Sequence, residues 1–370
     1  MTSFVTNGRL PELSLWSKLG DRRVPLDFTL EITARCNNNC RHCYINLPAR
    51  NNAARQKELT LEEIADIADQ AVALGALWCL VSGGEPLLRP DFPEIYLMLR
   101  KKGLLVSIFT NACLVSEQHI ALFKKYPPRD IEVSVYGVTR KTYERVTRRP
   151  GSFSAFQNGL DLLLKSGMNI RLKAMALRSN VHELPEIAAF CREHTYDYFR
   201  FDPLLHLRYD GDQRRNQEIL SERLSPEEIV AVEQADDDRT EAMQKGCDRL
   251  IHPDYDGPVC NHLFHCGLGN KSFAVSYDGI FRLCPDLWHP NCIYDLRQGY
   301  LAEAWNELVP RVRDMRSSSR TFLETCRRCP IINLCLWCPA HAHLETGKLD
   351  GFSDYFCAVA HARAQALKPG

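Results

Sequence analysis

Three cysteines near the N-terminus are close enough in sequence to bind one metal group together. Cys36, Cys40 and Cys43 are separated by three and then two residues, and they follow an alternating apolar run at residues 26–32. A structural zinc takes four protein donors, and a ferredoxin cluster takes four thiolates. A compact group of three thiols therefore predicts an iron–sulfur cluster in which one iron has no protein ligand and can bind another molecule.

A second and larger set of cysteines lies in the C-terminal third of the chain. Its members are Cys260, Cys266, Cys284, Cys292, Cys326, Cys329, Cys335, Cys338 and Cys357. The densest part holds two C-x2-C pairs with only five residues between them. Paired zinc ligands commonly stand about 12–20 residues apart, so this gap disfavours a single zinc site. His341 and His343 follow closely and could serve a zinc, although histidines on a helix face are common.

The remaining sequence features place these thiols in a reducing compartment. Residues 1–20 contain no apolar core of a signal peptide, and no later window has 18 uninterrupted apolar residues. A cytoplasmic protein without a membrane span is expected, and disulfides are rare there. Most of the sixteen cysteines are then predicted ligands, whereas Cys79, Cys113 and Cys191 lie in apolar runs and are predicted to be small buried core residues.

The net charge bears on the class of partner, and the chain length bears on the number of domains. Lys and Arg total 46, as do Asp and Glu, so the net charge is zero and nothing favours nucleic acid or an anionic membrane as partner. With 370 residues, the chain is long enough for one barrel-sized domain of about 200–250 residues and a smaller one.

The elements that must position the first three thiols alternate between short strands and longer helices. Strands are predicted at 26–32, 77–82, 104–109, 131–136, 169–176 and 198–202. Helices are predicted at 60–74, 91–102, 116–125, 152–166 and 182–193. This alternation is typical of parallel βαβ units, and six of them over residues 26–205 predict a partial (β/α)6 barrel of the TIM type. Functional loops then lie at the C-terminal ends of the strands, where the first cysteine loop is also expected.

The rest of the chain is divided by composition. Residues 1–25 are expected to form an N-terminal arm, and residues 206–257 a polar linker with one helix that begins at Ser225. The acidic run 236–238 in this linker is predicted to be solvated. Residues 258–370 are predicted to form a small cysteine-rich domain.

The first cysteine loop resembles the C-x3-C-x-Φ-C motif of the radical S-adenosylmethionine (SAM) enzymes, with His42 in the aromatic position Φ. In that family the open iron of a [4Fe–4S] cluster binds SAM. Reductive cleavage of SAM then gives a 5'-deoxyadenosyl radical that takes a hydrogen atom from the substrate. Gly83, Gly84 and Glu85 resemble the GGEP motif of the family, which implies contact with the SAM ammonium, and glycine suits a close approach of backbone to ligand.

Three further segments resemble SAM-binding positions of the family. Ser134 lies in a strand similar to V-S-x-D-G, which implies contact with the SAM ribose, although Tyr136 stands where relatives have Asp. Arg148 resembles an arginine that reaches the SAM carboxylate, a pairing that suits a guanidinium, but adjacent arginines before a helix also fit surface charge. Asn111 follows the third strand in a Thr-Asn-Ala sequence similar to Thr-Asn-Gly.

The C-terminal cysteines resemble the SPASM domain, the auxiliary-cluster domain of many radical SAM peptide-modifying enzymes. This resemblance implies two auxiliary [4Fe–4S] clusters, hence three clusters in all. The first would take Cys260, Cys266, Cys284 and Cys338, and the second Cys326, Cys329, Cys335 and Cys357. Cys247 and Cys292 remain unassigned, and Cys292, close to Cys284 in sequence, is the better substitute if the register is wrong.

Relatives with this domain mostly act on a ribosomal peptide or protein side chain, by crosslinking or oxidation. The resemblance therefore implies a peptide maturase that works with a flavodoxin- or ferredoxin-type reductant and with a separate leader-binding protein. Asp286 follows Cys284 by two residues, where it could be the catalytic base that sulfatase-maturating relatives use, or an ordinary turn aspartate. Alternatives are a small-molecule enzyme acting on a tetrapyrrole, sugar or cyclitol, and a non-enzymatic iron–sulfur or zinc protein.

Overall fold

The computed structural model describes residues 22–195, 200–251, 260–335 and 337–367. Its main feature is a sheet of nine strands in the order β11-β10-β9-β1-β4-β5-β6-β7-β8. The strands are β1 (Asp27–Thr33), β4 (Trp78–Gly83), β5 (Leu105–Thr110), β6 (Asp130–Ser134), β7 (Ile170–Met175), β8 (Arg200–Asp202), β9 (Ser272–Val275), β10 (Ile280–Arg282) and β11 (Ile293–Asp295). A separate parallel pair, β2 (Arg35–Cys36) and β3 (Leu47–Pro48), flanks the first cysteine loop.

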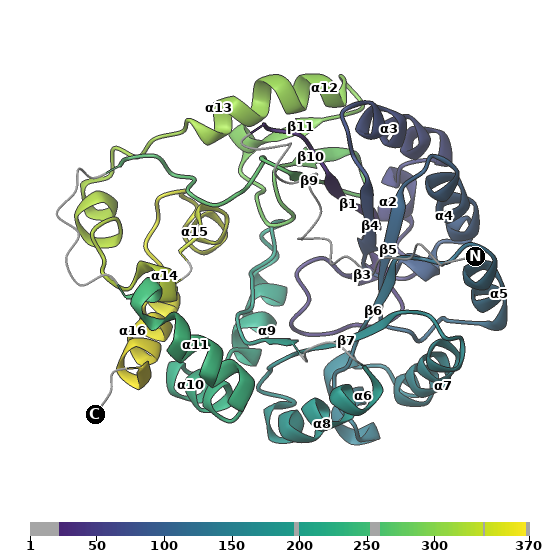
Figure 1. Ribbon diagram of the computed structural model, residues 1–370, viewed down its shortest axis with the longest axis horizontal. Coiled ribbons are helices and arrows are strands. Elements are labelled where there is room, and N and C mark those ends of the chain that lie inside the picture. The colour runs from purple at the N-terminus through teal and green to yellow at the C-terminus, as the bar shows by residue number, and fades with distance from the viewer. Residues whose placement is uncertain (1–21, 196–199, 252–259, 336, 368–370) are drawn as a thin grey trace, which may run out of the picture.

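Six strands, β1 and β4 to β8, pair in parallel with their neighbours in chain order. Helices cover the outer face of this curved sheet (Figure 1). They are α3 (Leu61–Ala73), α4 (Phe92–Lys101), α5 (Glu117–Lys125), α6 (Arg140–Thr147), α7 (Ser152–Lys165) and α8 (Leu184–His194). The predicted partial barrel is therefore confirmed. Helix α6 was not predicted, because Tyr143 and Val146 are its only large apolar residues and are too few to show a helical pattern. Both side chains are buried.

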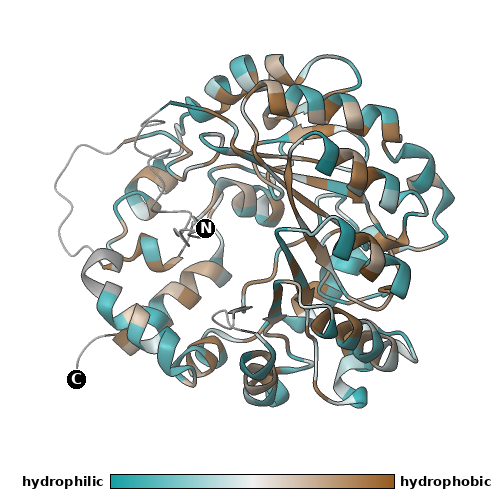
Figure 2. Cartoon of the chain, turned by 45° about the vertical axis from the view of Figure 1, so that its right-hand side comes forward, coloured by the Kyte–Doolittle hydropathy of each residue, from teal (hydrophilic) through white to brown (hydrophobic). Residues whose placement is uncertain are grey.

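Local sequence explains why these elements form where they do. Helix α3 begins with a capping box, in which the Thr60 hydroxyl accepts from the Glu63 backbone and the Glu63 carboxylate accepts from the Thr60 backbone. Its apolar residues recur at helical spacing and are buried against the sheet. Figure 2 shows the same pattern across the molecule, with apolar strands inside and polar faces of the helices outside.

The C-terminal part continues the barrel sheet. Strand β9 pairs in parallel with β1, and β10 and β11 add to it as antiparallel strands. A buried ion pair joins the two parts, because Arg282 on β10 donates to the carboxylate of Glu31 on β1 and both side chains are almost fully enclosed. The first strand therefore lies inside the sheet, between the barrel strands and the cysteine-rich segment.

The polar segment between residues 206 and 251 forms three helices, so the prediction of one helix was wrong. They are α9 (Gln213–Glu222), α10 (Pro226–Gln234) and α11 (Asp237–Leu250). Helix α10 begins at the Ser225 cap as expected. The spacing of apolar residues does not predict helix α9, because two of its three buried residues, Arg215 and Glu222, are charged.

One residue of the acidic run also differs from expectation. Asp236 is buried and forms an ion pair with Arg192 at 2.8 Å. Its carboxylate also accepts from the backbone N–H of Arg239 in the first turn of α11. Asp237 and Asp238 are exposed, as predicted.

The remaining helices lie outside the barrel. They are α2 (Asn52–Lys57), α12 (Leu301–Glu303), α13 (Val309–Arg313), α14 (Ile332–Cys335), α15 (Pro339–Thr346) and α16 (Asp354–Leu367). Helix α16 packs beside α10, where buried Arg363 pairs with Glu233 at 2.6 Å (Figure 1). In the part of the chain that the structure describes, no helix has the length and apolar character required to cross a membrane.

Candidate iron–sulfur and S-adenosylmethionine site

The first cysteine loop leaves the end of β1 at the C-terminal edge of the parallel sheet. Cys36 and Cys40 are buried, and Cys43 is half-buried. Burial raises the pKa of Cys36 and Cys40, and negative charge on neighbouring thiols, Cys43 among them, raises it further. Each thiolate makes it less favourable for the other two to ionise. Iron supplies the positive charge that stabilises thiolates, so this group of three suits the binding of one iron–sulfur cluster.

Buried polar atoms around this loop have no partner in the protein. They are Asn37 Nδ2, Asn38 Oδ1 and His42 Nδ1. Such atoms are costly unless something else bonds to them, so they fit a polar ligand beside the thiols. Burial lowers the pKa of His42 to about 4, so its ring is neutral, and the ring lies 5.2 Å from that of Tyr136 just past β6.

The two glycines after β4 pack against the backbone that leads into the cysteine loop. A Cβ on Gly83, whose φ is +136°, would lie 2.2 Å from the Thr33 carbonyl oxygen, and one on Gly84 would lie 2.4 Å from that of Arg35. The N–H groups of Gly84 and Glu85 donate to the same two carbonyls, at 2.7 and 2.9 Å. Because Gly83 and Gly84 have no side chain, the turn after β4 can pack directly against the backbone at Thr33 and Arg35.

Glu85 uses its carboxylate inside the protein. It is fully buried and accepts from the Thr110 hydroxyl and the Asn111 N–H at 2.8 Å and from the Leu87 N–H at 3.1 Å. Burial raises the pKa of Glu85 to about 7, although these three hydrogen bonds oppose the rise. In this arrangement the side chain ties the turn after β4 to the end of β5.

The end of β5 also reaches the thiols. The Asn111 side chain donates to Asn37 Oδ1 at 2.8 Å and lies 3.7 Å from the Cys36 sulfur. Cys113 is half-buried, within 3.9 Å of both Asn38 Nδ2 and the Tyr143 hydroxyl. The prediction of a simple core residue at Cys113 was wrong, because the loop after β5 turns this thiol toward the first cysteine loop. Cys79 and Cys191 are buried core residues as predicted.

Three arginines hold the backbone of the cysteine loop, and we call Arg148, Arg208 and Arg215 the arginine clamp. Arg215 donates to the Cys40 carbonyl at 2.9 Å, and Arg148 donates to the Asn39 carbonyl at 2.7 Å. Arg208 donates to the carbonyls of Cys43 and Asn46 at 3.4 and 3.2 Å. No sequence pattern indicates Arg208 or Arg215, because both lie in the polar segment that is predicted to be a linker.

Arg148 does not have a free guanidinium. Besides Asn39, it binds both oxygens of Glu218 at 2.9 and 3.0 Å. In the structure it therefore holds the cysteine loop and α9, and its contact with a SAM carboxylate stays a prediction. Ser134 ends β6 and is half-buried at the same sheet edge as the glycine turn. A hydrogen bond from Ser134 opposes the rise in the pKa of Tyr136 that burial causes.

The C-terminal thiols form two groups. Cys326, Cys329, Cys335 and Cys357 influence each other, since burial and the charges of the other three raise the pKa of Cys335 to about 12. Burial raises the pKa of Cys338, and the charge of Cys266 raises it further. These two thiols therefore belong to the second group. Burial, Asp286 and Cys338 raise the pKa of Cys284 to about 12, which places Cys284 in that second group. Each group brings together thiols predicted to share one cluster.

Cys260 stands apart from its predicted partners. It is exposed, and its sulfur lies 3.1 Å from Nδ1 of His262. That hydrogen bond lowers the pKa of Cys260, and none of Cys266, Cys284 or Cys338 contributes. The structure thus collects three of the four thiols predicted for the first auxiliary cluster. A four-cysteine site for the first auxiliary cluster requires that Cys260 lie beside Cys266, Cys284 and Cys338.

The relation to known proteins is clear at the barrel. Residues 30–191 match the radical SAM superfamily. Residues 30–191 therefore form a radical SAM domain. Its cofactors are therefore SAM and a [4Fe–4S] cluster, for which the Cys36–Cys43 loop has the required donors. None of the cysteines whose side chains the structure describes forms a disulfide.

Several characterised proteins resemble this radical SAM protein along most of its length. Fe-coproporphyrin III synthase of Methanosarcina barkeri is 26% identical over 331 residues, which are 82% of this chain and 80% of that protein. The subtilosin biosynthesis protein AlbA of Bacillus subtilis is 23% identical over 85% of this chain and 67% of its own. The PqqA peptide cyclase of Gluconobacter oxydans is 27% identical over 82% of both chains.

Solved structures show the same fold. Streptococcus suis SuiB bound to its precursor peptide SuiA has a TM-score of 0.66 at 16% identity, over 90% of this chain and 76% of SuiB. The protein anSMEcpe with bound AdoMet has a TM-score of 0.63 at 13% identity, over 92% of this chain and 96% of its own. At this identity the likeness concerns the fold of the radical SAM protein and not its substrate.

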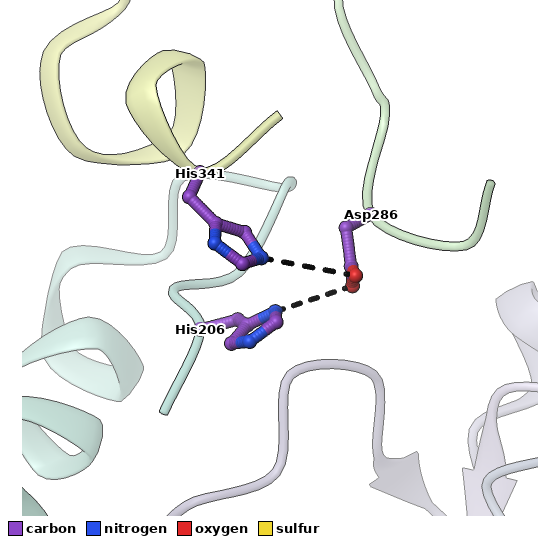
Figure 3. Close-up of side chains that lie close together, drawn as sticks. All are labelled: His206, Asp286 and His341. Carbon is purple, nitrogen blue, oxygen red and sulfur yellow. Dashed lines mark ion pairs between the residues drawn. The ribbon is translucent and has the colours of Figure 1, made fainter. Parts of the chain in front are cut away.

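Asp286 meets two histidines that lie far from it in sequence (Figure 3). Its carboxylate is 3.4 Å from Nδ1 of His206 and 3.9 Å from Nε2 of His341. Burial alone would raise the pKa of Asp286, but the two neighbouring imidazoles hold it far below its usual range. So acidic a carboxyl group is a weak base, which disfavours the predicted role of Asp286 as a lone proton acceptor.

The two unassigned cysteines have different outcomes. Cys292 is fully buried, its sulfur lies 3.8 Å from that of Met315, and burial raises its pKa to about 12. No other thiol contributes to that shift, and Cys292 packs in the core. The side chain of Cys247 lies outside the described residues.

Proposed function

We propose that this radical SAM enzyme is a peptide maturase. It cleaves SAM reductively at the cluster held by Cys36, Cys40 and Cys43, and the resulting 5'-deoxyadenosyl radical takes a hydrogen atom from a side chain of a ribosomal peptide or protein. The observation that carries the proposal is the convergence of these thiols with the Gly83–Gly84 turn at the C-terminal edge of the parallel sheet. Active sites of barrels built from βα units lie at this edge.

Some residues around the cysteine loop are proposed to contact SAM, and others are proposed to position the loop. The backbone of Gly83 and Gly84, the neutral ring of His42 and the Ser134 hydroxyl are the proposed contacts with SAM. Glu85 and Arg148 are positioning residues, because Glu85 already accepts a hydrogen bond from the Asn111 N–H and Arg148 already pairs with Glu218. This division leaves the unpartnered polar atoms of Asn37 and Asn38 to bond the cofactor.

We further propose that residues 258–370 hold two auxiliary [4Fe–4S] clusters. Cys326, Cys329, Cys335 and Cys357 would bind one, and Cys266, Cys284 and Cys338 with Cys260 the other. Such clusters can pass an electron away from the substrate radical, and their binding contributes to folding because the thiolates have no other cation. In the cytoplasm, a flavodoxin or ferredoxin would supply the electron for SAM cleavage, and a separate protein would bind the peptide leader.

The likeness to AlbA and to the PqqA peptide cyclase supports a peptide substrate. One observation favours a second candidate: Fe-coproporphyrin III synthase is 26% identical over 82% of the chain. On this alternative the substrate is a tetrapyrrole whose side chains are oxidised.

The two candidates are separated by offering both substrates to the same enzyme. The anaerobically reconstituted protein is incubated with SAM and dithionite, together with either an iron tetrapyrrole precursor of Fe-coproporphyrin III or the short peptides encoded beside its gene. A peptide that loses two hydrogens, with 5'-deoxyadenosine formed in proportion, supports the maturase. Consumption of the precursor tetrapyrrole with no change in any peptide would overturn the maturase and support the second candidate.

A further inference from the structure

Three metal-binding side chains from distant segments meet beside the proposed auxiliary clusters. His206 lies in the loop after β8, Asp286 follows β10, and His341 lies in the first turns of α15 (Figure 3). One ligand atom from each residue lies within 4.8 Å of the other two. We propose that His206, Asp286 and His341 bind a divalent transition-metal ion, which we call the His–Asp–His site.

The distances in this group suit ligands of one ion better than direct hydrogen bonds. The gaps from the carboxylate to the two imidazole nitrogens are 3.4 and 3.9 Å. Hydrogen bonds from nitrogen to oxygen are about 2.7–3.2 Å long. Two ligands bound at about 2.1 Å to one tetrahedral or octahedral ion stand about 3–3.5 Å apart.

The donor set defines the class of metal. Two imidazoles and one carboxylate bind zinc in hydrolytic enzymes and iron(II) in oxygenases, and they differ from the all-thiolate sets of iron–sulfur clusters. Three protein donors leave coordination positions open, which is typical of catalytic metal sites. The side chains of His206, Asp286 and His341 are 22, 27 and 18% exposed, so an ion and a further ligand can reach them.

The position of the site connects it with the first cysteine loop. His206 lies two residues before Arg208, whose guanidinium donates to the Cys43 carbonyl at 3.4 Å. On the other side, Asp286 lies close to Cys284 and Cys338. The His–Asp–His site therefore lies between the radical-generating loop and the C-terminal thiols. An open metal position there can hold an oxygen, nitrogen or sulfur atom of the substrate.

A second histidine pair in the same region lacks the third donor. The rings of His289 and His343 lie 4.8 Å apart and meet edge to face. The described part of the chain brings no carboxylate to this pair in a group of three donors. His343 lies two residues from His341 on the same helix, so it offers a matched control.

Metal binding is tested on the protein with all its clusters loaded and oxidised, in the absence of SAM and substrate. Manganese(II) is titrated in and its free form is counted by electron paramagnetic resonance, to which oxidised [4Fe–4S] clusters are silent. Zinc(II), which binds nitrogen and oxygen sites more tightly than manganese, is measured as metal retained after gel filtration. The variants are His206→Ala, Asp286→Asn and His341→Ala, with His343→Ala as control.

We expect one bound equivalent of either metal in the wild type and in His343→Ala. The three site variants should bind at least about tenfold more weakly, which corresponds to the loss of one ligand. His206 lies outside the cysteine-rich segment, so His206→Ala keeps the test valid if His341→Ala loses iron or fails to fold. Failure of the wild type to bind either metal, or equal binding by His206→Ala, overturns the proposal. Binding is measured without SAM, so this outcome is independent of the proposed peptide maturase activity.

Discussion

Arg215 on helix α9 donates a hydrogen bond to the backbone carbonyl of Cys40, at 2.9 Å and across 175 residues of sequence. The same guanidinium reaches the side chains of Asn46 and Glu218 at 2.6 Å. It is buried, so these bonds are shielded from water and are stronger than exposed ones. A segment that lies outside the six βα units therefore fixes the shape of the loop that carries the first cluster.

Loss of this contact should impair the cluster more than the fold. Arg215→Ala removes charge-assisted hydrogen bonds and should lower the free energy of unfolding by about 2–3 kcal/mol. It should also reduce SAM cleavage by about tenfold or more, because the Cys40 thiol loses its fixed position. Iron content and 5'-deoxyadenosine formation measure the effect. Exposed Arg214 supplies the control, since Arg214→Ala should behave as wild type. Equal activity of the two variants would contradict a role for Arg215 in the clamp.

The glycine turn gives a second prediction. Gly83→Ala places a methyl group 2.2 Å from the Thr33 carbonyl and strains a φ of +136°. The turn must then move away from the cysteine loop, and SAM binding should fall by about tenfold or more. Gly103→Ala has the same kind of backbone strain, with φ +86° and open space around the new carbon, and should cost only about 1 kcal/mol of stability. Isothermal titration with SAM compares the two, and similar affinities would refute the close-packing explanation.

The buried carboxyl group of Glu85 predicts a pH dependence of stability. Its pKa is about 7 in the folded protein, whereas an unfolded glutamate has a pKa of about 4.3. The folded state thus binds more protons between these values, so this contribution to stability is complete at low pH and is lost as the pH rises through 7. The advantage of wild type over Glu85→Gln should fall by about 1 kcal/mol from about pH 6 to about pH 8. Urea denaturation measures it, and an advantage that grows with pH would refute the raised pKa.

The grouping of the C-terminal thiols predicts iron counts. Wild type should bind about twelve irons, and Cys326→Ala about eight, because one cluster loses a ligand that its three partners cannot replace. Cys292→Ala should keep all its iron and lose about 1–2 kcal/mol of stability, since Cys292 packs in the core beside Met315. Iron and sulfide analysis of reconstituted protein decides. A full count in Cys326→Ala, or iron loss in Cys292→Ala, would show that the ligand assignment is wrong.

The barrel could be predicted from sequence because its signals are local. Capping residues such as Thr60 and alternating apolar strands fix each element within a few residues, and the order of βα units then fixes a parallel sheet. The spacing of Cys36, Cys40 and Cys43 is equally local. The pairing of β9 with β1 was not predictable in this way, because four-residue strands carry little pattern and their partners are chosen by tertiary packing.

Other parts of the site depend on contacts that no local pattern records. Arg208 and Arg215 belong to a polar segment, and only the folded chain shows that their guanidinium groups face the cysteine loop. His206 is similar, since its importance comes from Asp286 and His341, more than seventy residues away in sequence. The motif points to Arg148, but only the folded chain shows its contacts with Asn39 and Glu218.

The most direct test of the central claim is reductive SAM cleavage by the anaerobically reconstituted protein. With dithionite and SAM, the wild type should form 5'-deoxyadenosine and methionine. Cys40→Ala should form neither, while it retains the iron of the C-terminal thiol groups. If the wild type carries its clusters and binds SAM but yields no 5'-deoxyadenosine, the assignment of the Cys36–Cys43 loop as the radical-generating site is wrong.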